Sequence, residues 1–171
     1  RQIQNLSSFY GRNLENYKAL FLGNHDALAA GADLISFAAS EAYEAFGFNR
    51  ANASVPKLYL FGSVDSVLKL SDNGLDAINQ LPFYTYINVG FESVDAPTLS
   101  FIRKPLDASK VQSAFQKMLA INETFQNLEV TGNFLIGQQL SPEHYESLAD
   151  LLRTAPKSPN GKGTVYLSPL K

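Results

Sequence analysis

An acidic residue and a hydroxyl residue end the most apolar run of the sequence. Residues 85–91 (TYINVGF) are β-branched and aromatic, which is typical of a buried strand, and Glu92 and Ser93 follow directly. In α/β proteins, ligands bind at the carboxyl ends of parallel strands, because loop amides and helix N-termini converge there. We therefore predict that Glu92 and Ser93 contact a ligand. The alternative for Glu92 is an ion pair with Arg103 or Lys104.

Three further apolar runs end in small and polar residues. These clusters are GNHD (23–26), GSVDS (62–66) and GNFLIG (132–137). Each cluster alone is typical of an ordinary turn. Four such clusters, each at the end of an apolar run, favour one site spread along an edge of a sheet. The alternative to a ligand contact is a turn position for His25 and a helix N-cap for Asp26.

Strand-like and helix-like segments alternate along the chain. We expect strands at 18–23, 57–62, 85–91, 128–136 and 164–169. From apolar spacing and N-cap residues we expect helices at 3–11, 27–46, 71–81, 96–102, 107–125 and 141–155. Leu34 is expected on the apolar side of the second helix, together with Ile35. The alternation predicts an α/β protein with a parallel sheet, in one domain over 1–171. An open doubly wound sheet and a section of a barrel both fit it.

Composition restricts the possible functions. A net charge of −2 gives no electrostatic case for nucleic acid or an anionic membrane, and no apolar run reaches the roughly 18 residues that span a bilayer. No signal-peptide pattern is visible, so we expect a cytoplasmic protein. With no cysteine and only two histidines, His25 and His144, no metal site is expected within these residues. We expect His144 and Glu143 to be exposed at the surface.

The order of these segments resembles the radical SAM enzymes. In that superfamily a strand ending in Gly-x-Glu-Ser leads to a helix with a leucine and a short basic stretch, matched here by 90–93, Leu99 and 103–105. A later family strand resembles 133–137, and glycine-rich strand ends resemble 23–28 and 61–63. The resemblance covers nearly all of 18–155.

The resemblance implies a partial TIM-type (β/α) barrel, with parallel strands and its N-terminal unit missing. S-adenosylmethionine would lie across the strand ends, and a [4Fe–4S] cluster would cleave it reductively to start radical chemistry on a substrate that the sequence does not indicate. The methionine amino group would lie by 23–26, the ribose and methionine end by Glu92 and Ser93, and the adenine by Ile136 and Gly137. The implied cofactor-binding residues are Gly23, Asn24, His25, Asp26, Ser63, Glu92, Ser93, Asn133, Ile136 and Gly137.

The chain departs from the family at the cluster ligands, because the Cys-x₃-Cys-x₂-Cys motif is absent. It also has Asn24 and His25 where the family more often has Gly or Glu. We therefore expect a piece of a longer enzyme, truncated at both ends and inactive by itself, that dimerises through an exposed barrel edge. The alternatives are a degenerate barrel that acts as a binding or scaffold module, and a receiver-like domain. The receiver-like domain would need paired acidic residues after an early strand, which we do not find.

Overall fold

The chain forms a five-stranded parallel sheet. The computed structural model describes residues 1–50, 54–156 and 160–170. The strands are β1 (Ala19–Phe21), β2 (Lys57–Gly62), β3 (Tyr84–Glu92), β4 (Leu128–Ile136) and β5 (Val165–Pro169). Every neighbouring pair is parallel, and the strands stand in chain order from β1 to β5. The predicted α/β class with a parallel sheet is confirmed, and the strands lie close to their expected positions.

One helix precedes the first strand, and the others lie between successive strands. They are α1 (Gln2–Tyr10), α2 (Ala32–Ala45), α3 (Val64–Lys69), α4 (Asp72–Asn79), α5 (Ala96–Phe101), α6 (Ala108–Thr124) and α7 (Pro142–Thr154). Short 3-10 turns add η1 (Gly11–Asn16), η2 (Ala27–Ala30) and η3 (Phe48–Arg50). Several helices begin at side-chain caps: Ser71 accepts from the Gly74 amide and Asp95 from the Thr98 amide. Because these hydroxyls and carboxylates satisfy otherwise unpaired N–H groups, they determine where each helix starts.

Two helical regions differ from expectation. The helix expected over 27–46 is divided at Gly31, whose φ of 85° no helix accommodates, so α2 starts only at Ala32. Its buried stripe includes Ile35, whereas Leu34 is 57% exposed and the expectation for it was wrong. Helix α3 was not predicted, because six residues are too short to show a helical period.

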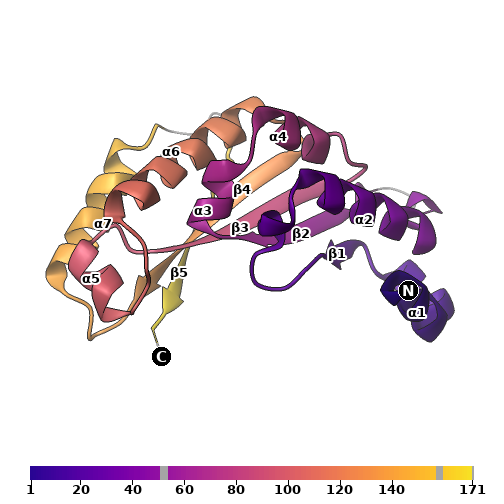
Figure 1. Cartoon of the computed structure of the whole chain (residues 1–171), viewed down its shortest axis with the longest axis horizontal. Coiled ribbons are helices and arrows are strands. Elements are labelled where there is room, and N and C mark those ends of the chain that lie inside the picture. The colour runs from indigo at the N-terminus through magenta and orange to yellow at the C-terminus, as the bar shows by residue number, and fades with distance from the viewer. Residues whose placement is uncertain (51–53, 157–159, 171) are drawn as a thin grey trace.

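All the helices that pack on the sheet cover the same side of it. Figure 1 shows α2, α3, α4, α6 and α7 above the strands, while α1 and α5 lie toward the two ends of the molecule. Strand β3 alternates accordingly between buried and half-buried residues. Ile87 and Phe91 face the helix layer, and Tyr86 and Asn88 face the other side of the sheet. We call this uncovered side of the sheet the open face.

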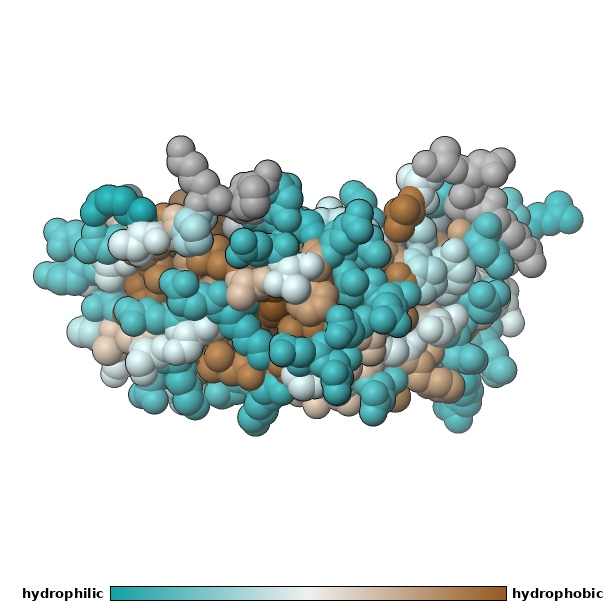
Figure 2. Space-filling model, turned by 90° about the horizontal axis from the view of Figure 1, so that it is seen from above, coloured by the Kyte–Doolittle hydropathy of each residue, from teal (hydrophilic) through white to brown (hydrophobic). Residues whose placement is uncertain are grey.

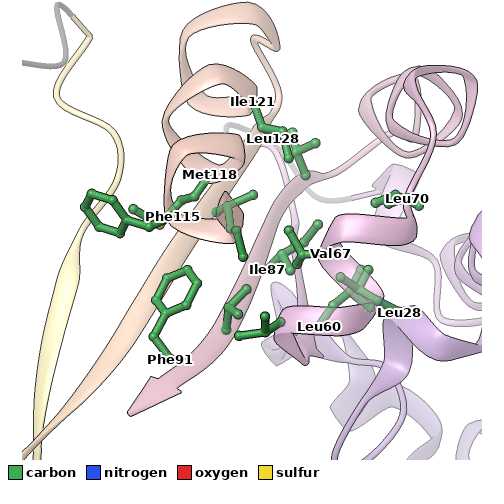
Figure 3. Close-up of a cluster of buried hydrophobic side chains, with 14 of the residues drawn as sticks. Leu28, Leu60, Val67, Leu70, Ile87, Phe91, Phe115, Met118, Ile121 and Leu128 are labelled. Atoms are coloured by element: carbon green, nitrogen blue, oxygen red, sulfur yellow. The ribbon is translucent and has the colours of Figure 1, made fainter. Parts of the chain in front are cut away.

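The core lies between the sheet and the helices. Phe91 from β3, Phe134 from β4 and Phe115 from α6 are buried against one another, with ring centroids 5.4 to 6.3 Å apart. Figure 3 shows Phe91, Phe115 and Met118 within this layer. A Cβ at Gly132 would come within 2.6 Å of the Phe91 ring, so close ring packing requires glycine there.

A buried asparagine holds the first half of β4. Strand β5 pairs with β4 only from Gly132 onward, so Val130 lacks a strand partner on that side. The Asn122 side chain on α6 donates to the Val130 carbonyl at 2.8 Å and accepts from its N–H at 2.7 Å. Asn122 therefore replaces a missing strand and locks α6 onto β4.

The outer surface of the helix layer is mostly polar. Figure 2, seen from the helix side, shows hydrophilic residues across most of it, with apolar residues in small patches. Within the described residues, every helix is too short or too polar to cross a bilayer.

Candidate functional site

The parallel strands bring the candidate residues to one edge of the sheet. Residues 23–26 follow β1, Ser63 follows β2, Glu92 and Ser93 end and follow β3, and 133–137 end β4. Strand pairing aligns these ends: Gly62 lies beside Val89, and Gly90 beside Asn133. The sequence therefore correctly placed the candidates at a common edge, although their local environments differ.

The ends of β1 and β2 are joined through Asp26. Its Oδ1 accepts a hydrogen bond from the Ser63 amide at 3.2 Å. Burial opposes ionisation of this carboxyl, but hydrogen bonds from Ser63 and Ser66 outweigh that effect and lower the pKa of Asp26. Asp26 is thus held as a carboxylate at the edge. Asn24 and His25 beside it are exposed.

Behind these two strand ends lies a hollow of about 560 Å³. Asp26 and Ser63 line it together with the start of α2 and with Lys69 and Ser71. Its walls therefore combine hydroxyls, carboxylates and one amine. Because Ser63 and Ser71 already cap α3 and α4, these hydroxyls have structural roles there.

Glu92 occupies a strained turn. Its φ is 66°, in the left-handed region that glycine favours, and the Ser93 N–H donates to the Phe91 carbonyl at 2.8 Å. A bond from residue i+2 back to residue i defines a γ-turn, and a positive φ at the central residue is its strained form. The strand pairing is irregular at the same place, between Gly90 and Glu92.

The Glu92 carboxylate lies over the backbone of Gly90. A Cβ at Gly90 would approach Glu92 Oε1 to 2.6 Å, so a larger residue there would displace the carboxylate from this position. The Lys104 ammonium bonds the same oxygen at 2.9 Å. The ion-pair alternative for Glu92 is therefore present with Lys104. Oε2 has no hydrogen-bond partner among the described residues, so a ligand contact remains open to it.

The neighbouring Ser93 is completely buried, and so is its partner. Its hydroxyl lies 2.8 Å from His144 Nδ1 and accepts from the Asp95 amide at 3.0 Å. His144 Nε2 lies 2.8 Å from the Leu135 carbonyl. Because a carbonyl only accepts, Nε2 donates to it, and in the neutral imidazole Nδ1 accepts the Ser93 hydroxyl proton. The expectation of a surface His144 was wrong, since the ring faces inward from α7; Glu143 is exposed as expected.

On the open face, an amide chain runs beside this turn. The Asn133 side chain donates to Asn88 Oδ1 at 2.7 Å, and the Asn88 amide donates to Thr131 Oγ1 at 2.8 Å. Asn133 Oδ1 has no hydrogen-bond partner in the described chain. Sequence reasoning missed Asn88 and Thr131, although their alternation with Ile87 and Val130 indicates which side of the sheet they face.

The end of β4 is tied to neighbouring segments. The Gly137 N–H donates to Tyr145 Oη at 2.9 Å, and that hydroxyl donates to the Gly137 carbonyl at 2.7 Å. The Ile136 carbonyl accepts from the Leu170 amide at 2.7 Å. The backbone polar groups at Ile136 and Gly137 that these bonds engage are thus satisfied within the protein.

Aromatic rings cover the amino-terminal and β1 side of the open face. The rings of Phe21, Tyr59 and Tyr86 stack in sequence across three strands, with centroids 4.9 and 5.3 Å apart. Burial and the nearby Glu129 carboxylate raise the pKa of Tyr84 to about 12. These rings line the open face of the sheet.

Among the described residues, no three His, Asp or Glu side chains are grouped closely enough to hold a metal ion. Comparisons of the sequence with protein-family models and with curated proteins find no match.

Proposed function

We propose that this chain is the central part of a radical SAM catalytic domain, a section of a partial (β/α) barrel that binds S-adenosylmethionine at its strand ends. The segment order from residue 18 to 155 supports the proposal. So does a parallel sheet in chain order with its helices on one side, because that is how a section of a (β/α) barrel is built. The open face then corresponds to the inside of the barrel.

The observation that carries the proposal is the Glu92 turn. At the end of a central parallel strand, a backbone with a φ of 66° holds the Glu92 carboxylate over Gly90. Strain of this kind collects where function requires a particular geometry.

The residues present suit S-adenosylmethionine. Glu92 Oε2 would accept from ribose hydroxyls, the Asn133 Oδ1 would accept from a further donor, and the Asp26 carboxylate would attract an ammonium group. S-adenosylmethionine, when bound, would supply a carbon–sulfur bond for reductive cleavage. The described residues orient the cofactor, and the substrate stays undetermined.

The cluster is different, because the chain has no cysteine and offers no thiolate to a [4Fe–4S] cluster. The proposal therefore requires Cys-x₃-Cys-x₂-Cys in a segment encoded upstream in the same gene. The chain alone should show no reductive cleavage.

The test is made on the full-length protein, purified and reconstituted with iron and sulfide without oxygen. With dithionite and S-adenosylmethionine it should form 5′-deoxyadenosine, and the 171-residue chain treated in the same way should not. An upstream sequence without the three cysteines would contradict the proposal and favour a binding or scaffold module.

A further inference from the structure

The strained turn at Glu92 requires something to enforce it, because a glutamate left to itself relaxes to negative φ. The ion pair with Lys104 is a weak restraint, since the lysine side chain is 38% exposed and solvent screens the pair. The next residue in the chain, Ser93, is a stronger one. It is completely buried, and its backbone N–H closes the turn.

The Ser93 hydroxyl is restrained from two sides. It accepts from the Asp95 amide and bonds His144, which in turn bonds the Leu135 carbonyl of β4. The imidazole thus bridges the loop after β3 and the end of β4. The ring comes from the first turn of α7, 51 residues from Ser93 in the chain, whereas the Asp95 amide is only two residues away.

We propose that His144 is a positioning residue: through Ser93 it holds Glu92 in the strained turn and directs the carboxylate across Gly90 onto the open face. What Glu92 binds there rests on the proposed function, whereas the effect of His144 on the turn does not.

The two ring nitrogens have separable roles. An asparagine at position 144 reaches about as far as Nδ1 and keeps an acceptor for the Ser93 hydroxyl. A glutamine reaches about as far as Nε2 and keeps the donor to the Leu135 carbonyl. If the contact with Ser93 sets the turn, His144→Asn should preserve it and His144→Gln should release it. A purely space-filling histidine would make no such distinction.

The first experiment uses the 171-residue chain without ligand. NMR reports the sign of the Glu92 φ through its HN–Hα coupling together with the intraresidue HN–Hα NOE, which is strong at positive φ, and hydrogen exchange reports protection of the residue 93 amide. His144→Gln and Ser93→Ala should both bring φ to negative values and reduce protection about tenfold, as expected for loss of one net hydrogen bond. His144→Asn should stay near the parent.

Ser147→Ala is the matched control, because Ser147 also lies on α7 and its hydroxyl bonds only the His144 carbonyl. It should leave the turn unchanged. If His144→Gln fails to fold, Ser93→Ala decides the matter, since it removes one hydroxyl and adds no volume. A positive φ and undiminished protection in Ser93→Ala would overturn the proposal.

The second experiment measures S-adenosylmethionine affinity in the full-length protein with Glu92→Gln, His144→Gln and the double variant. Each single change should weaken binding roughly tenfold, and the double variant should be no weaker than Glu92→Gln, because His144 acts through Glu92. Additive losses of affinity in the double variant would refute an effect of His144 through Glu92. If the parent protein does not bind S-adenosylmethionine, the proposed function fails, while the NMR experiment still decides the role of His144.

Discussion

Replacing Glu92 by glycine and by alanine separates backbone strain from the loss of its ion pair. Both variants lose the Lys104 contact, so that loss cancels in their comparison. Alanine retains the cost of a φ of 66°, about 1–3 kcal/mol for a residue other than glycine. Glycine removes that cost but loses about 0.5–1 kcal/mol through greater freedom in the unfolded chain. The glycine variant should therefore be more stable than the alanine variant, by up to about 2.5 kcal/mol.

The assay is urea unfolding at equilibrium, followed by circular dichroism. The matched pair is Gln116→Gly and Gln116→Ala, at an exposed position inside α6, where the order should reverse and glycine should be the less stable by about 1 kcal/mol. An alanine variant at position 92 that is more stable than the glycine variant by about 0.5–1 kcal/mol, which is the cost of glycine alone, would show that the turn stores no strain. Strain at Glu92 would then give no reason to assign this residue a function.

Three further outcomes are expected. Asn122→Ala should destabilise the chain by about 2–5 kcal/mol in urea unfolding, because it leaves both buried backbone groups of Val130 unpaired; a loss below about 1 kcal/mol would mean that water replaces the side chain. Since folding raises the pKa of Tyr84 from 10.0 to about 12, the contribution of Tyr84 to stability should be constant below pH 10 and be lost between pH 10 and 12. Tyr84→Phe should flatten that slope. The chain should self-associate in sedimentation at high concentration, and Phe21→Glu, at a ring 63% exposed on edge strand β1, should weaken this association; a monomer at all concentrations would contradict it.

Local sequence patterns determined the elements of this protein and the edge that carries the candidate site. Strands β2 and β4 lie where the apolar runs are, and helix α7 begins after Ser141, followed by proline, as its start signature predicts. Because all strands are parallel, strand order along the chain was enough to bring the ends of β1 to β4 to a common edge. These features follow from interactions between residues near one another in sequence, together with the rule that parallel strands are joined by right-handed crossovers.

Only the tertiary structure decided which side chains at that edge act together. His144 sits in the first turn of a helix, where local pattern predicts exposure, and its burial comes from a loop that is 51 residues away in the chain at Ser93. The positive φ of Glu92 has no sequence signal either, since glutamate is not a residue that favours it. Asn122 is a helix residue whose partner, the Val130 backbone, is exposed to it only because β5 starts late. In each case a buried hydrogen-bonding group depends on a partner that packing supplies. Packing between distant segments cannot be predicted from a local sequence pattern.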